Sequence, residues 1–225
     1  CTDPACCNAW LSEEAAREKW GGDFDGWERR IEEAVAATDG QVALYDGQPI
    51  LAVFHSSSAG KTAGAGDVWS GDVPYLRSVD SPEGEETVPN YYSAAAFSAA
   101  EAKSLLAKAH PELTLSGGPD RWFGAVERDD SGRVRTVEVC GTALRGVELR
   151  RIFALRSACF TIDASADKVT FRVTGYGHGV GMSQYGANEL ARQGKTWQEI
   201  LTWYYADVTV GPAPETVQTA ESVVN

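Results

Sequence analysis

A run of alternating glycines, Gly175-Tyr-Gly-His-Gly-Val-Gly181, is the strongest chemical signal in this sequence. Glycine tolerates positive φ angles and lets the backbone approach a ligand closely. The run leads into a predicted helix near Ser183, and free backbone N–H groups at a helix start favour oxygen-rich ligands. The motif therefore predicts either a ligand-facing loop around His178 or a tight turn between a strand and a helix.

A second polar loop, His55-Ser-Ser-Ser-Ala-Gly60, follows a predicted strand. A histidine beside serines permits a hydrolase in which Asp67 or Asp80 is the third catalytic residue. The Gly-x-Ser-x-Gly elbow of many such enzymes does not occur in the sequence. We therefore favour a hydrogen-bonded loop, with the serine hydrolase as an alternative.

Three of the five cysteines, Cys1, Cys6 and Cys7, lie within the first seven residues. Three thiolates can hold zinc tetrahedrally when a fourth ligand joins them. Cys6 and Cys7 are adjacent, and adjacent cysteines rarely bond to each other. The spacing leaves a metal site, reduced cysteines and a disulfide of Cys1 open.

The glutamates show no catalytic pattern in the sequence. Glu83, Glu85 and Glu86 fall in an acidic stretch that we expect to be solvated, and Glu189 and Glu199 fall on predicted helices with exposed faces. We therefore assign no catalytic carboxylate within these 225 residues.

The elements that must position these residues mix helices with hairpins, which predicts an α+β fold. Asp46-Gly47 predicts a hairpin turn, and Ser98 with Glu101 predicts a capping box. The acidic stretch 81–90 is the best candidate linker. Helices are expected at 13–19, around 27–35, and at 98–109, 146–154, 183–193 and 196–205, and strands at 41–45, 49–54, 121–128, 133–139, 159–162 and 168–174.

We expect three segments: residues 1–80 as the first part of a core domain, 81–160 as a smaller α+β lobe, and 161–225 as the return to the core domain. Lys and Arg number 20 and Asp and Glu 32, a net charge of −12, which argues against nucleic-acid binding. The apolar runs are too short to cross a bilayer.

The motif from Gly175 to Ala187, with Ile200-Leu-Thr-Trp-Tyr-Tyr205, resembles the C-terminal signature of the stage II sporulation protein D family. That family of peptidoglycan lytic transglycosylases includes the amidase enhancers. Further segments match it in order: 54–60, 67–69, 73–79 and 155–162. The resemblance covers about residues 1 to 210.

The resemblance implies a zinc site of the clostridial type, with Cys1, Cys6 and Cys7 as ligands and a fourth ligand upstream. Cys6 stands where the family pattern has histidine. The family's catalytic glutamate belongs to a segment upstream of the cysteines, which is the main departure of this chain. We therefore expect the catalytic acid outside these residues.

The resemblance implies cleavage of stripped glycan strands during engulfment in sporulation, with 1,6-anhydromuramic acid ends as products. The implied partner is an amidase, stage II sporulation protein P, and the implied location is outside the cytoplasmic membrane, anchored through a missing N-terminal segment. The alternative is a non-enzymatic, peptidoglycan-binding amidase enhancer. The implied groove residues, of which Tyr75, Ser183 and Gln184 rank first for substrate contact, are His55, Ser57, Tyr75, His178, Ser183, Gln184 and Tyr185.

Overall fold

The computed structural model describes residues 11–214 and confirms the α+β prediction. The chain divides into two compact units, with the boundary between Val42 and Ala43. Across the described residues, no helix has the length and apolar character needed to span a membrane.

The first unit contains two helices joined by a short 3-10 turn, Gly21–Asp23. Helix α1 (Glu13–Trp20) begins at Ser12, whose hydroxyl accepts a hydrogen bond from the Ala15 N–H. Helix α2 (Phe24–Thr38) carries Trp27, Ile31 and Val35 at spacings of four. Their side chains are about half exposed, at 48% for Trp27 and 51% for Ile31.

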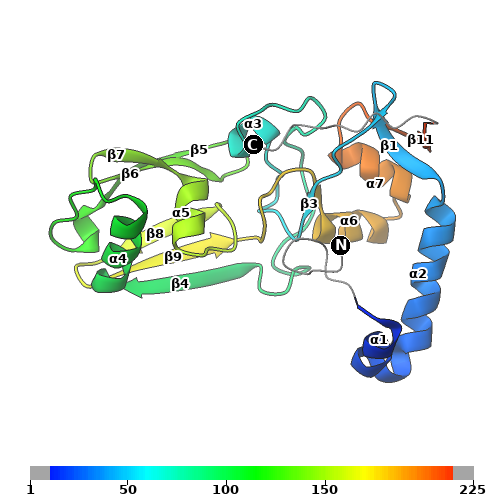
Figure 1. Cartoon of the computed structure of the whole chain (residues 1–225), viewed down its shortest axis with the longest axis horizontal. Helices are drawn as coiled ribbons and strands as arrows, with labels where there is room; N and C mark the ends of the chain where they lie inside the picture. Colours follow the sequence, from blue (N-terminus) through cyan, green and yellow to red (C-terminus); the bar gives the residue numbers. More distant parts are fainter. Residues whose placement is uncertain (1–10, 215–225) are drawn as a thin grey trace. The chain divides into compact units, whose positions relative to one another are not determined.

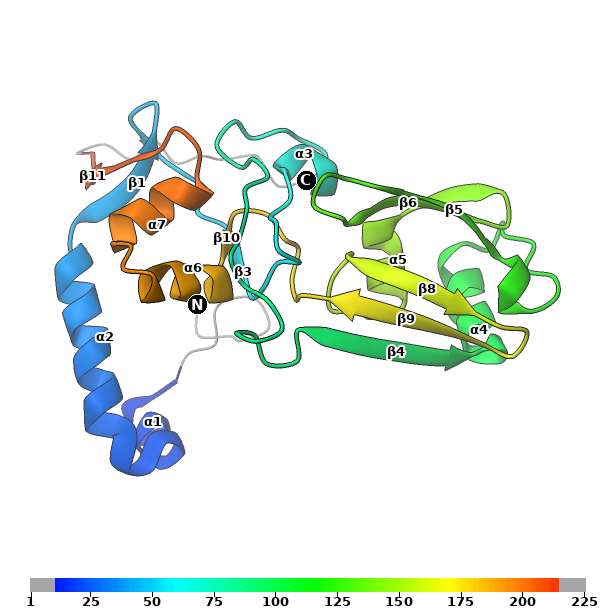
Figure 2. The same cartoon turned by 180° about the vertical axis from the view of Figure 1, so that it is seen from behind.

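The second unit contains two hydrophobic cores, and residues 92–174 build the first. Figures 1 and 2 show its two antiparallel sheets together with α4 (Ala99–Ala109) and α5 (Gly146–Ile152). One sheet has the order β4-β9-β8, and the other has the order β5-β6-β7. The strands are β4 (Tyr92–Ser98), β5 (Phe123–Arg128), β6 (Val134–Val139), β7 (Thr142–Arg145), β8 (Phe160–Ala164) and β9 (Lys168–Thr174).

Segments before and after this insertion build the second core. They include the predicted hairpin at Asp46-Gly47, which joins the sheet β11-β1-β2, and the parallel pair β10-β3. Helices α6 and α7 lie beside them in both views (Figures 1 and 2). The elements are β1 (Gln41–Tyr45), β2 (Gln48–Pro49), β3 (Phe54–His55), α3 (Ala65–Val68), β10 (Met182–Ser183), α6 (Gln184–Arg192), α7 (Trp197–Tyr204) and β11 (Thr209–Pro212).

The chain enters and leaves the inserted segment at one point. The Gly175 N–H donates to the Tyr91 carbonyl over 2.9 Å, where β4 begins and β9 ends. The chain therefore returns at Gly175 rather than at residue 161, the limit expected from the sequence, because β8 and β9 pair in the same sheet as β4.

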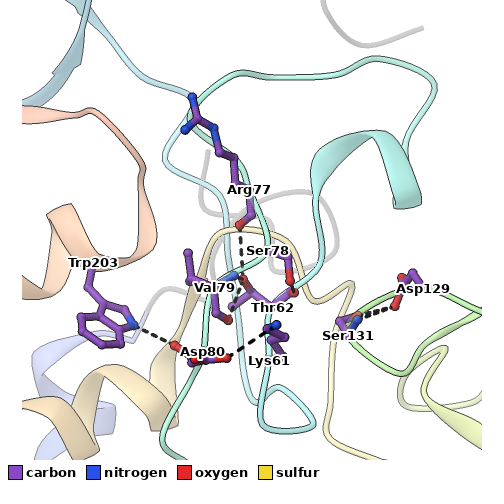
Figure 3. A network of polar contacts seen from close by, with 9 residues as sticks. All are labelled: Lys61, Thr62, Arg77, Ser78, Val79, Asp80, Asp129, Ser131 and Trp203. Atoms are coloured by element: carbon purple, nitrogen blue, oxygen red, sulfur yellow. Dashed lines mark hydrogen bonds and ion pairs between the residues drawn. The ribbon is translucent and has the colours of Figure 1, made fainter.

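A network of polar contacts fixes the segment that leads into the candidate site (Figure 3). The Val79 N–H donates to the Thr62 hydroxyl over 2.9 Å, and the Thr62 N–H donates to the Val79 carbonyl over 2.8 Å. The Trp203 indole N–H donates to the Asp80 carbonyl over 2.7 Å. These contacts hold residues 79–80 between Thr62 and Trp203 of α7.

Phe171 lies at the centre of the first core and is fully buried. Its ring centroid is 4.5 Å from that of Phe153 and 5.5 Å from that of Phe160. We expect Phe171→Ala to lower the free energy of unfolding by about 3–5 kcal/mol through the lost contacts and the cavity. Urea denaturation measures this, and Val126→Ala, at a residue 40% exposed, is the control. Equal losses in the two variants would contradict the prediction.

Candidate functional site

The two polar loops singled out from the sequence lie against each other. Strand β3 pairs with β10 in parallel, with Phe54 opposite Met182 and His55 opposite Ser183. The backbones of Ser57 and Tyr176 exchange two hydrogen bonds, of 3.0 and 2.9 Å. Residues more than 100 positions apart in the sequence therefore form one site.

The alternating glycines are required by this contact between the loops. Gly175 and Gly177 both have positive φ angles, of 72° and 121°. A Cβ on Gly175 would lie 2.7 Å from the Ser57 carbonyl oxygen, and one on Gly177 would lie 2.7 Å from the His55 Cβ. The backbone at Gly175 and Gly177 thus uses the freedom of glycine to approach residues 55–58 of the same chain closely.

His55 is 4% exposed and hydrogen-bonded at both ring nitrogens. Its Nδ1 lies 3.2 Å from the Val180 carbonyl oxygen, and its Nε2 lies 2.7 Å from the Ser58 Oγ. Because a carbonyl only accepts, Nδ1 carries the proton and Nε2 accepts from the Ser58 hydroxyl. Ser58 is fully buried, so this histidine–serine pair holds the loop in place and does not present a nucleophile.

Burial is the main cause that lowers the pKa of His55, to about 3, and the positive charges of His178 and Arg133 act in the same direction. His55 is therefore neutral near pH 7. Burial also lowers the pKa of His178, whose ring centroid lies 5.7 Å from that of His55 and 5.5 Å from that of Trp69.

Arg133 supports the glycine motif from the inserted segment. It is 3% exposed, and its Nη2 donates to the Gly177 carbonyl over 2.9 Å. Its Nε has no hydrogen-bond partner among the described residues. Burial lowers the pKa of Arg133 to about 10, so the group remains a cation at neutral pH.

Glu83 lies inside the site, and its predicted place in a solvated loop is wrong. The side chain is 6% exposed, whereas Glu85 and Glu86 are exposed. Its Oε1 accepts from the Ser58 N–H and from the Ser183 hydroxyl, both over 2.6 Å. The stretch 81–90 is therefore not a simple linker, because its first residues are anchored in the core.

The second carboxylate oxygen of Glu83 lies near Gly186, together with the hydroxyls of Ser81 and Tyr204. Its Oε2 is buried and has no hydrogen-bond partner among residues 11–214. A Cβ on Gly186 would collide with this oxygen, with the Ser81 hydroxyl and with the Tyr204 hydroxyl. Ser81 and Tyr204 bond to each other over 2.6 Å, so α6 begins tightly against three buried polar groups.

The predicted groove residues divide by accessibility. His55, Ser57 and Ser183 are at most 4% exposed and belong to the buried frame. A ligand could reach the partly exposed His178 and Tyr185 and the exposed Gln184. Substrate contact by these three stays a prediction.

Tyr75 packs against the second core, and its side chain contacts the hairpin region. Its hydroxyl accepts a hydrogen bond from the Leu51 N–H over 2.9 Å, and its ring packs 5.2 Å from that of Tyr45. The contacts of its side chain thus belong to the hairpin region rather than to the glycine motif.

The expected zinc ligands Cys1, Cys6 and Cys7 lie outside the described residues, so the zinc site stays a prediction. Within residues 11–214, no group of three or more His, Cys, Asp or Glu side chains is placed to hold a metal ion. Cys140 and Cys159 are both free thiols.

This chain is similar to stage II sporulation protein D. Identity with the *Bacillus subtilis* protein is 34% over 94% of the chain, and with the *Bacillus amyloliquefaciens* protein it is also 34% over 94%. The amidase enhancer of *Bacillus subtilis* is 25% identical over 82% of the chain.

The chain spans about 60% of the length of the stage II sporulation protein D sequences and 33% of that of the amidase enhancer. No protein-family model matches the chain.

No local pattern in the sequence distinguishes Glu83, Ser58 or Arg133 from its neighbours. Glu83 and Glu85 stand in the same acidic stretch, and Ser58 is one of three consecutive serines. Only the contacts between distant segments distinguish them.

We expect Glu83→Ala to lower the free energy of unfolding by about 1–3 kcal/mol, because it leaves the Ser58 N–H buried without an acceptor and leaves the Ser183 hydroxyl only its 3.4 Å contact to the Ser56 carbonyl. Glu83→Gln keeps an acceptor oxygen and should lose less. Urea denaturation compares both with Glu85→Gln, which removes an exposed charge nearby. Three equal stabilities would show that the Glu83 contacts contribute nothing.

Stability should fall as the pH drops below the pKa of an unfolded histidine, about 6.5. The pKa of His55 is lower in the folded state, so below pH 6.5 the unfolded chain binds a proton that the folded chain does not. The contribution of neutral His55 to the free energy of unfolding is complete above pH 6.5 and is lost as the pH falls toward 3. We expect a loss of about 2 kcal/mol between pH 7 and pH 5, measured by urea denaturation. The same pH difference in His55→Gln would refute the assignment to this residue.

Proposed function

We propose that this chain is the glycan-binding part of a peptidoglycan lytic transglycosylase that acts on stripped strands during sporulation. The observation that carries the proposal is the similarity to stage II sporulation protein D over 94% of the chain. The buried frame of His55, Ser58 and Glu83 supports it, because such a frame can hold the glycine motif rigid beside a ligand.

The chemistry needs one acid and no water. The acid protonates the glycosidic oxygen between muramic acid and N-acetylglucosamine while the bond to the muramic C1 breaks. The same group then takes the proton of the muramic C6 hydroxyl, whose oxygen bonds to C1 and gives the 1,6-anhydro end. This acid must be protonated near neutral pH, which requires a pKa raised by a partly apolar pocket.

We place that acid outside the described residues. Glu83 is the glutamate that contributes to the buried frame, and its Oε1 already accepts two hydrogen bonds. With 6% of its surface exposed, it is suited to positioning Ser58 and α6 rather than to reaching a sugar. His178, Gln184 and Tyr185 are the proposed contacts to the strand.

The second candidate function is a non-enzymatic module that binds peptidoglycan and enhances an amidase. The similarity to the amidase enhancer of *Bacillus subtilis* favours it. In this case the same buried frame would support binding, and no acid would be needed.

Three further proposals accompany either function. Cys1, Cys6 and Cys7 are the proposed zinc ligands, and thiolates are suitable donors for that ion. The proposed partner is an amidase of the stage II sporulation protein P type, which removes the peptides from the strand. The proposed location is outside the cytoplasmic membrane, anchored by a segment of a longer protein.

Mass spectrometry of the products from stripped glycan strands tests the proposal. This 225-residue chain is compared with a longer form that carries a candidate acid. We expect anhydro-ended products, lighter by one water than hydrolysis products, from the longer form alone. Binding by the short chain should persist, measured by cosedimentation with purified strands.

Two results would overturn this assignment. Binding without cleavage by either form would favour the amidase-enhancing module. Cleavage by the short chain would place the acid within it, and Glu83→Gln beside Glu85→Gln would then show whether Glu83 is that acid.

A further inference from the structure

A pocket lined by arginines lies beside the glycine motif, at the end of α5. Its volume is about 420 Å³. Its lining includes no acidic residue, although the chain has 32 Asp and Glu against 20 Lys and Arg. The lining residues are Val147, Arg150, Arg151, Ala154, Leu155, Arg156 and Tyr176.

The three arginines have no carboxylate partner among the described residues. Arg150 donates from Nε to the Leu155 carbonyl over 3.3 Å, and Arg156 donates from Nη1 to the Asn90 carbonyl over 3.0 Å. These acceptors are neutral, so the positive charges in the pocket are not compensated locally. Elsewhere in this unit, Arg77 and Arg172 pair with Asp207 and Asp163.

The pocket also presents an aromatic face. The guanidinium carbon of Arg156 lies 4.5 Å from the centre of the Tyr176 ring, and that tyrosine is 47% exposed. A planar guanidinium can hold a carboxylate through two parallel hydrogen bonds, and the exposed ring offers an apolar surface to a sugar. Charge and shape therefore suit an acidic sugar.

The pocket is connected to the candidate site through the backbone. Tyr176 belongs to the glycine motif, and the next residue, Gly177, donates its N–H to the Arg156 carbonyl over 2.9 Å. Only Gly177 separates Tyr176, which lines the pocket, from His178. A ligand that contacts His178 would thus pass close to the arginines.

We infer that the pocket of Arg150, Arg151 and Arg156 binds the lactyl carboxylate of a muramic acid in the glycan strand. A strand freed of its peptides carries one such carboxylate on each muramic acid, whereas a peptide-bearing strand has it blocked as an amide. The inference rests on the proposed binding of glycan strands and adds a means of selecting stripped ones.

Equilibrium binding by the 225-residue chain tests the inference with two probes. These are soluble stripped glycan strands and the same strands with their carboxylates converted to methylamides. We expect Arg151→Gln and Arg156→Gln together to bind the unmodified strands about tenfold or more weakly, since charge-assisted hydrogen bonds are lost. Wild type should lose a similar factor on the methylamide strands, and the double variant should not distinguish the two probes.

Arg29→Gln is the matched control, because it removes the same charge from α2, in the first unit. It should bind as wild type does. Arg151→Gln alone is the variant that should keep the fold, because that side chain is exposed and makes no hydrogen bond to the described residues. Weaker binding by this variant therefore reports the pocket and not a folding defect.

The outcomes separate this inference from the proposed function. Failure of wild type to bind either probe would refute glycan binding itself. Equal binding of both probes by wild type would refute the carboxylate pocket while leaving glycan binding intact. A phosphate polymer, polyglycerol phosphate, is the third probe, and loss of its binding alone in the double variant would reassign the pocket to phosphate.

Discussion

The carboxylate of Glu83 is the contact on which the candidate site depends, because one oxygen joins three segments of the chain. It accepts from the Ser58 N–H in the loop 55–60 and from the Ser183 hydroxyl at the start of α6. Glu83 itself follows the network at residues 61–80 that Figure 3 shows. Without it the buried Ser58 N–H would lack an acceptor, and the Ser183 hydroxyl would keep only a 3.4 Å contact to the Ser56 carbonyl. An unsatisfied buried donor costs about 1–3 kcal/mol.

The glycine motif completes this frame by allowing close backbone contact. A side chain at Gly177 would meet His55, and one at Gly186 would meet Glu83 and Tyr204. His55 is kept neutral by burial and is hydrogen-bonded at both ring nitrogens. It thereby connects the loop 55–60 to the glycine motif at Val180. The accessible side chains of the motif, including Gln184, thus project from a frame that has little freedom to move.

Buried charges of opposite sign lie on different sides of this frame. The negative charge of Glu83 is buried on one side, where N–H and hydroxyl donors face it. Arg133 and Arg150 belong to the inserted segment, and their positive charges add to burial, the larger cause, in lowering the pKa of His178. An anionic strand at the glycine motif would therefore meet the partly exposed Arg150, whereas Arg133 is buried, even though the chain as a whole carries a charge of −12.

The sequence by itself determined the features that depend on neighbours within a few residues. The helix caps at Ser98 and Thr196 formed as capping boxes, and the turn after Arg128 joined β5 to β6, because their donors and acceptors lie within about four positions. The tertiary structure alone decided the role of Glu83, whose two partners lie 25 and 100 residues away. Local patterns describe the exposed Glu85 and the buried Glu83 alike, because burial of a charge is set by donors that only the folded chain brings together.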